Sequence, residues 1–176
     1  ASTKSTGIAI FNDKELVHYD CFTASSSDLI KRIQKIISAL NKLLQEHKDI
    51  EKLILEEVHP EDNIQSLQTH RALMWLQAAI AFLLHETNPK AEIEYVYPSS
   101  WRAKCGIKNG RGIRREMAKE LDIAFVKKEY LIDVNEDVAN AIGIGHAYVN
   151  KLNNENMQKE LIAFVFNAGA EMIKEQ

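Results

Sequence analysis

The stretch Leu53-Ile54-Leu55-Glu56-Glu57-Val58 is the clearest indicator of the fold. A compact apolar run is followed at once by two acidic residues, and helical patterns bound the run on both sides. This arrangement predicts a buried strand in an α/β sheet. Polar groups at the carboxyl end of such a strand tend to line a ligand crevice. The acidic pair is therefore either part of a functional site or only the point where the chain leaves the sheet and meets water.

The segments that precede this strand predict a hairpin and a helix. Residues 8–11 are apolar, Asn12-Asp13-Lys14 has turn chemistry, and residues 15–20 resume as a strand, which is typical of a β-hairpin. Ser25-Ser26-Ser27-Asp28 offers N-caps, and apolar residues then recur at helical spacing to about residue 47.

The segments that follow it alternate in the same way. We expect a helix over residues 66–87, a strand over 92–97 and a basic loop at 109–112. A charged helix to about residue 121 and a helix from the Asn135 cap to about residue 148 follow. The order predicts an α/β fold: a mixed sheet with an opening antiparallel hairpin and helices on both faces.

The two ends of the chain carry further expectations. Residues 1–7 resemble a turn between two strands, so we expect that a strand precedes Ala1 and that the first strand of the sheet is truncated in this sequence. Residues 1–150 are expected to form one domain. Residues 151–176 are expected to form a C-terminal helical appendage, with a polar linker and then a helix over residues 160–175.

Composition excludes several classes of protein. The content of 45% hydrophobic and 27% charged residues in 176 residues is ordinary for a soluble globular domain. Cys21 and Cys105 form no CxxC pair, so a zinc site or a disulfide framework is not expected, and free thiols suit a cytoplasmic protein. The longest apolar stretch, residues 72–84, is shorter than the roughly 18–20 residues that cross a bilayer, and we expect no membrane partner.

The net charge of −3 hides a strong asymmetry. Residues 101–128 hold nine basic and three acidic residues, a balance of +6, so the rest of the chain carries −9. Two like-charged pairs at i,i+4 spacing, Arg111–Arg115 and Arg115–Lys119, disfavour an isolated helix. A polyanion would relieve that repulsion. The alternative is a solvated surface helix, but the pattern favours a surface that binds nucleic-acid phosphates.

The helix that begins after Asn135 carries the second group of candidate ligands. Asp137 and Asn140 are three residues apart and share one helix face. A carboxylate and an amide oxygen there could hold a hard divalent cation. The alternative is that Glu136 and Asp137 only complement the helix dipole, an effect of about 0.3–1 kcal/mol.

Taken in order, these segments resemble the RuvC-type Holliday-junction resolvases of the ribonuclease-H-like superfamily, above all the shorter phage- or prophage-encoded ones. The resemblance covers about residues 1–149. It rests on Ser2-Thr3-Lys4-Ser5-Thr6-Gly7, Leu55-Glu56-Glu57-Val58 with Asn63 following, Tyr97-Pro98-Ser99-Ser100-Trp101-Arg102, and Glu136-Asp137-Val138-Ala139-Asn140-Ala141-Ile142.

The resemblance implies a ribonuclease-H-like fold and four acidic residues around one or two Mg²⁺ or Mn²⁺ ions. Glu56 matches the glutamate at the end of the buried strand and Asp137 the first acid of the last helix. Asn140 lies where relatives usually have Asp, and the remaining Asp would lie immediately before Ala1. A neutral ligand at Asn140 is expected to weaken cation binding and activity.

Three functions remain open from the sequence. The first is a metal-dependent endonuclease that cleaves Holliday junctions or other branched DNA as a homodimer, with Glu56, Asp137 and Asn140 at the metal site. The second is a catalytically impaired module that binds branched DNA. The third is an actin-like nucleotide-binding half-domain, suggested by the Ser/Thr-Gly hairpin. The expected DNA contacts are Thr3, Lys4, Ser5, Asn63, Trp101, Arg102, Lys104, Lys108, Arg111, Arg114 and Arg115.

Overall fold

The computed structural model describes residues 3–58, 67–150 and the backbone of 160–165. The elements follow one another as β1 (Ser5–Asn12), β2 (Glu15–Thr23), α1 (Leu29–Glu46), β3 (Ile50–Glu56), α2 (Leu67–Thr87), β4 (Glu92–Val96), α3 (Pro98–Lys104), α4 (Arg115–Tyr130), α5 (Glu136–Val149) and β5 (Glu160–Val165). None of the helices within these ranges combines the length and the apolarity needed to span a bilayer.

A single mixed sheet has the strand order β2-β1-β5-β3-β4. β1 pairs antiparallel with β2, which confirms the opening hairpin, and β3 pairs parallel with β4. Between the two pairs lies β5, antiparallel to β1 and parallel to β3. The carboxyl ends of β3, β4 and β5 therefore meet at one edge of the sheet, which is where α/β folds place their sites.

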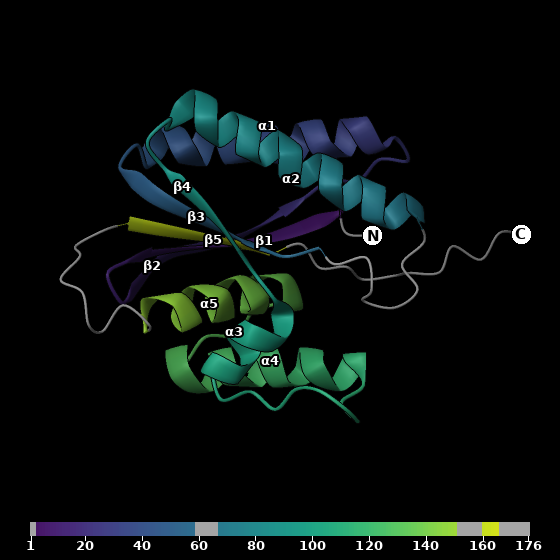
Figure 1. Cartoon of the computed structure of the whole chain (residues 1–176), viewed down its shortest axis with the longest axis vertical. Helices are drawn as coiled ribbons and strands as arrows, with labels where there is room; N and C mark the ends of the chain where they lie inside the picture. The colour runs from purple at the N-terminus through teal and green to yellow at the C-terminus, as the bar shows by residue number, and fades with distance from the viewer. Residues whose placement is uncertain (1–2, 59–66, 151–159, 166–176) are drawn as a thin grey trace, which may run out of the picture.

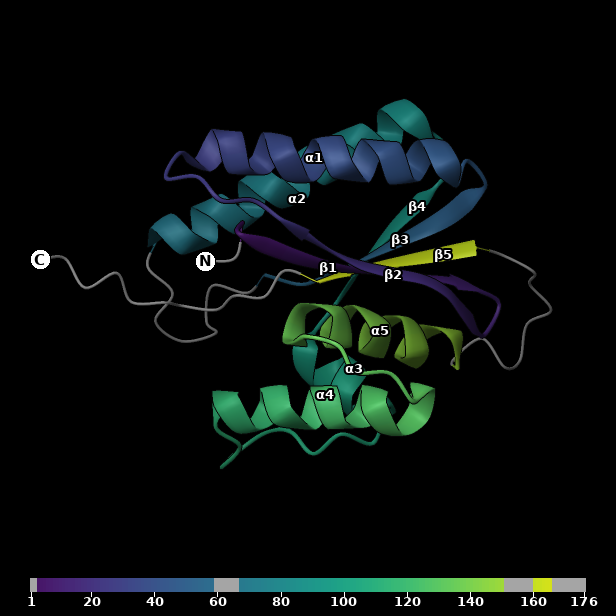
Figure 2. The same ribbon diagram turned by 180° about the vertical axis from the view of Figure 1, so that it is seen from behind.

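Helices cover both faces of the sheet, as the sequence predicts. Figure 1 shows α1 and α2 on one side of the sheet and α3, α4 and α5 on the other, with α4 beyond α5, and Figure 2 shows the same arrangement from behind. Successive residues of β1 and β3 point to opposite faces. Ile8 and Leu55 accordingly join the core under α1 and α2, whereas Ala9 and Ile54 join the core under α5.

The C-terminal segment departs from the sequence-based expectation. The helix expected over residues 160–175 is wrong for residues 160–165, which form β5 in the middle of the sheet. The run Leu161-Ile162-Ala163 is as consistent with a strand as with a helix, because a short apolar run has no distinguishing periodicity. Residues 166–176 lie outside the described residues.

Three smaller boundaries also differ. β1 begins at Ser5, so the Ser/Thr-Gly motif enters the strand instead of remaining in a turn. No helix was expected at α3, although Pro98 occupies a first-turn position where its missing N–H costs nothing. α4 continues to Tyr130 and ends with Leu131 in the left-handed conformation at φ 59°.

Candidate active site

Glu56 is a buried carboxylate at the end of the central parallel strand. As the last residue of β3 it shares the face of Ile54, two residues earlier, and so points toward α3 and α5. Its side chain is 8% exposed. The indole Nε1 of Trp101 donates to Glu56 Oε1 over 3.0 Å, and Gln77 Nε2 donates to the Glu56 carbonyl over 2.8 Å. Backbone and side chain are thus both held in place.

Its neighbour Glu57 has a different position. The Glu57 N–H donates to the Val96 carbonyl over 2.8 Å, which extends the pairing of β3 with β4 by one residue. Side chains alternate along the strand, so Glu57 points away from the α5 face. The Tyr95 hydroxyl lies near enough for the charge of Glu57, added to burial, to raise the pKa of Tyr95. Of the two acids that follow the apolar run, only Glu56 faces α5.

Asp137 lies in the first turn of α5, against the start of β1. The Asn135 side chain caps this helix by accepting from the Val138 N–H over 2.9 Å. Ser5 Oγ donates to Asp137 Oδ2, and a Cβ added at Gly7 would overlap the Asp137 carbonyl. The glycine in the Ser/Thr-Gly motif therefore allows the strand to touch the helix end that carries Asp137.

Asn140 follows Asp137 by three residues on the same side of α5. It is 2% exposed, and its Oδ1 has no hydrogen-bond partner among the described residues. A buried amide oxygen without a donor costs roughly 1–3 kcal/mol. Such an orphaned acceptor is suited to a donor or a cation from outside the chain.

Sheet register places these groups at the same end of the sheet. Gly7 is opposite Val165 of β5, and Leu55 is opposite the preceding Phe164. Gly7 and Glu56 therefore flank the carboxyl end of β5, about 10 Å apart at the usual strand spacing of about 4.8 Å. Because Gly7 touches Asp137, the carboxylates of β3 and α5 face the same end of the sheet.

The ligand atoms of this site are of the type that a hard divalent cation prefers, but they are few in number. Carboxylate and amide oxygens are the ligands that Mg²⁺ and Mn²⁺ prefer. Within residues 3–58 and 67–150, however, no three His, Cys, Asp or Glu side chains are grouped closely enough to hold a metal ion. The described residues offer two carboxylates and the orphaned oxygen of Asn140.

The structure corrects the roles expected for two residues of the basic segment. Trp101 is 1% exposed and donates to Glu56, so its ring is not available to stack on a base. Arg102 makes three hydrogen bonds of 2.8–3.1 Å to the buried Asp122. Burial alone would lower the pKa of Arg102, but Asp122 and the charge of Glu56 raise it overall. Arg102 therefore anchors α3 to α4.

The DNA contacts expected near the chain start also differ from one another in position: some residues are buried or bonded within the protein, and one is exposed. Thr3 is buried, and its Oγ1 accepts a hydrogen bond from Arg32 Nε over 2.8 Å, so this side chain stabilises the fold and does not face the DNA. Ser5 bonds to Asp137, as described above. Lys4 is exposed and lies next to them. Asn63 lies outside the described residues.

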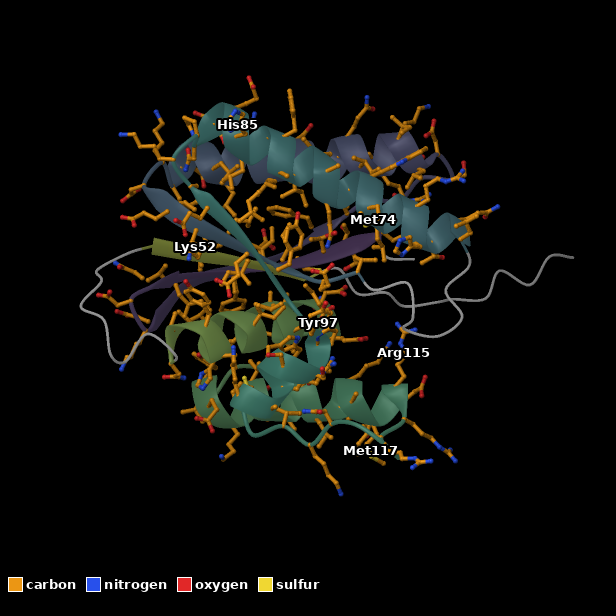
Figure 3. All side chains as sticks on the ribbon, in the orientation of Figure 1. Lys52, Met74, His85, Tyr97, Arg115 and Met117 are labelled. Carbon is orange, nitrogen blue, oxygen red and sulfur yellow. The ribbon has the colours of Figure 1, made fainter. Side chains whose placement is uncertain are left out.

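The remaining basic residues form an exposed surface from α3 to the start of α4. We call it the basic surface, and it comprises Lys104, Lys108, Arg111, Arg114 and Arg115. Gly110 and Gly112 have φ of 96° and 91°, so the loop between the helices uses conformations that favour glycine. In Figure 3 Arg115 projects from the start of α4 on the side of the sheet, whereas Met117 points away from it.

Two residues important to this arrangement were not found from the sequence. Asp122 reads as one acid in a charged helix, yet it is buried against Arg102. Gly143 reads as a neutral helix residue, yet a Cβ there would lie 2.5 Å from the Trp101 ring. Asp122, with Leu121 and Ile123 on either side, gave a weak signal that it lies against the core.

Comparisons with known proteins agree with this architecture. No family model matches the chain, and no curated protein matches it. Among solved structures, T. thermophilus RuvC in complex with a Holliday junction substrate superposes with a TM-score of 0.62 at 13% identity, covering 86% of this chain and 91% of that one. A second structure, Thermus thermophilus RuvC, gives 0.61 at 14% identity over 83% and 87% of the two chains. The chain therefore shares its ribonuclease-H-like mixed α/β fold with RuvC.

Proposed function

We propose that this protein is a divalent-metal-dependent endonuclease that cleaves branched DNA, with Holliday junctions as the substrate class. The observation that carries the proposal is the buried Glu56 carboxylate at the carboxyl end of β3, on the face of the sheet that α5 covers. Carboxylate oxygens are the ligands that Mg²⁺ and Mn²⁺ prefer, and polar groups at the carboxyl end of such a strand tend to line a ligand crevice. The likeness in fold to a RuvC solved with a Holliday junction supports the choice of substrate.

Glu56, Asp137 and Asn140 would hold the cation, as Mg²⁺ or Mn²⁺. When bound, such a cation supplies positive charge for water activation and for the leaving oxygen in phosphodiester hydrolysis. The protein's own part is to orient these oxygens. Trp101 fixes one oxygen of Glu56 and Ser5 fixes one oxygen of Asp137, while the Asn135 cap sets the start of α5.

The basic surface would bind the DNA backbone. It begins at Lys104, the last residue of the helix that carries Trp101, so phosphates bound there lie beside the site. Lys and Arg side chains neutralise phosphates without reading sequence. This matches a substrate that is recognised by its branched shape.

We further propose that two copies associate through α2. The middle of this helix is apolar on its exposed side: Met74 is 45%, Trp75 48% and Phe82 69% exposed. The other side packs on the sheet, so residues 72–84 are apolar all round except for Gln77, which is typical of a helix segment buried on both sides. A two-fold pair would present two sites to the two strands cut at a junction.

A cleavage assay with matched glutamate variants tests the function. The chain is incubated with a labelled four-way junction or linear duplex in Mg²⁺ or Mn²⁺, beside Glu56→Gln and Glu57→Gln. We expect the native chain to make paired nicks near the branch point. Glu56→Gln should lose these nicks but still bind the junction, and Glu57→Gln should keep them. Equal cutting of linear duplex, or full activity in Glu56→Gln, would contradict the proposal.

A second function is favoured by Asn140. A neutral amide in place of a carboxylate lowers the negative charge available to a cation, and only two acids of the expected set are among the described residues. The second candidate function is therefore a protein that binds junctions without cutting them. Junction binding that falls steeply with salt, with no cutting in either metal by the native chain or by Asn140→Asp, identifies this second function.

A further inference from the structure

Trp101 connects three elements around Glu56. α3 begins at Pro98, immediately after β4, and turns Trp101 inward into the core beneath the sheet. Its Nε1 donates over 3.0 Å to Glu56 Oε1, at the end of the neighbouring strand. Trp has only one polar atom, which is a donor, so this indole can stabilise a carboxylate but cannot compete for a cation.

Gly143 allows the indole to reach this position. A Cβ at Gly143 would lie 2.5 Å from Cζ3 of Trp101 and 3.2 Å from Cε3 and Cη2. Any residue other than glycine at position 143 would therefore push the Trp101 ring out of this position. Gly143 is one turn beyond Asn140 on the same helix face, so the ring that contacts Glu56 also lies beside the Asp137–Asn140 side of α5.

Arg102 contacts the face of the indole. Its Cζ lies 4.6 Å from the Trp101 ring centroid, within the range of a cation–π contact. The same guanidinium is bidentate to Asp122 of α4, whose side chain is completely buried. The indole thus contacts both a glycine of α5 and an arginine that α4 holds, and these contacts limit how far the ring can turn.

We propose that Trp101 is a positioning residue for cation binding: its N–H orients the Glu56 carboxylate toward the Asp137–Asn140 side of α5. This inference rests on the proposed function and adds a residue outside the ligand set. Side chains that orient a ligand by hydrogen bonding commonly change metal affinity or activity by about 10–100-fold when lost. Gly143 and Arg102 act through the indole and do not touch Glu56 in this scheme.

The test compares Trp101→Phe with Tyr19→Phe, an aromatic change on the outer strand β2. Trp101→Phe keeps a six-membered aromatic ring in the core but removes the N–H together with the rest of the five-membered ring, so the metal-free measurement below isolates the hydrogen bond. Mn²⁺ affinity is measured by calorimetry on the full chain without DNA. We expect Trp101→Phe to weaken Mn²⁺ binding by roughly 10–100-fold and Tyr19→Phe to leave it unchanged. Equal affinity in Trp101→Phe overturns the inference.

A metal-free measurement keeps the hydrogen bond separate from catalysis. The chain has two tryptophans, so its NMR spectrum has two indole N–H signals, assigned with Trp75→Phe. We expect the Trp101 signal to exchange slowly and Glu56→Ala to speed its exchange by roughly 10-fold or more, with no change in Glu57→Ala. An unchanged Trp101 signal in Glu56→Ala overturns the inference.

The two measurements also separate this inference from the proposed function. If Trp101→Phe loses Mn²⁺ affinity and the native chain does not cut junctions, the positioning role stands and the nuclease proposal fails. If the native chain cuts junctions and Trp101→Phe binds Mn²⁺ and cuts equally well, the positioning role alone fails. If the native chain binds no Mn²⁺, both fail.

Discussion

Gly7 of β1 lies directly against the backbone of Asp137 at the start of α5, so closely that a Cβ on Gly7 would overlap the Asp137 carbonyl carbon and oxygen. The contact joins the strand that opens the fold to the helix that carries two of the candidate ligands. The distance from Asp137 to the sheet is therefore set by backbone atoms on both sides, which cannot move aside as a flexible side chain can.

Replacing Gly7 by Ala should move α5 away from the sheet. Overpacking of this kind costs on the order of 1–3 kcal/mol, and here the obstructing atoms are backbone. Chemical denaturation would measure the loss. Asn12→Ala, at the exposed end of the same strand, should change the free energy of unfolding by less than about 0.5 kcal/mol. Equal stability of Gly7→Ala and the native chain would contradict this contact.

Asn140→Asp should make stability depend on divalent cations. The new carboxylate would be buried on the same face as Asp137, so we expect a lower Tm than the native chain in EDTA. A cation that binds both acids should restore stability, by about 2.7 kcal/mol at 100 times its Kd. Asn88→Asp is the control, because Asn88 is also buried but donates to the Lys48 and Ile50 carbonyls. Rescue of both variants by Mn²⁺, or of neither, would contradict a site at Asn140.

The basic surface should determine the salt dependence of junction binding. Each phosphate that the protein neutralises contributes about 0.9 to the slope of log Kd against log salt concentration on duplex DNA. Replacing Lys108, Arg111 and Arg114 by Ala should therefore lower that slope by about 0.9 for each phosphate that the variant no longer binds. The control pair, Lys127→Ala with Lys128→Ala, removes two basic residues of α4 that pair with Asp133 and Glu129 at 2.7 and 2.9 Å. An unchanged slope in the triple variant would exclude this surface from DNA binding.

His146 should make stability fall in mild acid. Burial lowers the pKa of His146, against a smaller opposing effect of the Glu129 charge, and Tyr130 Oη lies 2.8 Å from its Nδ1. Because the folded pKa lies below the unfolded value of about 6.5, the unfolded chain binds more protons between the two. The stabilising contribution is therefore complete above about pH 6.5 and is lost as pH falls toward the folded pKa. Unfolding curves from pH 5 to 8 should show this slope in the native chain and a smaller slope in His146→Gln.

Phe82→Glu should disrupt self-association. A charge in the middle of an apolar interface costs about 2 kcal/mol or more at a critical position, roughly 30-fold in dimer Kd. Light scattering after size-exclusion chromatography would show a shift toward monomer. Val17→Glu places the same charge on the outer strand β2, at another exposed apolar residue, and should have no effect. A native chain that is monomeric at all concentrations would exclude α2 as an interface between copies.

Local patterns were enough to predict the hairpin, the parallel strands, the helices on both faces and the cap of α5. These follow from residue spacing and turn chemistry, which act over a few residues and depend little on the rest of the chain. Glu56, Asp137 and Asn140 were candidates because their spacing combined with the resemblance to the RuvC-type resolvases; a strand end or a shared helix face alone left plainer alternatives open. Their role as ligands stays a prediction.

Contacts between distant segments decided the rest. A short apolar run near the chain end became β5 because the space between β1 and β3 offered backbone partners on both sides. From the sequence, Trp101 and Arg102 are predicted to be surface residues in a basic stretch. In the structure Trp101 hydrogen-bonds to Glu56, 45 residues away, and Arg102 hydrogen-bonds to Asp122, 20 residues away, so both side chains lie against the core. Hydrogen-bond partners and burial are properties of the folded chain, so no local pattern can distinguish a tryptophan that contacts DNA from one that orients a carboxylate.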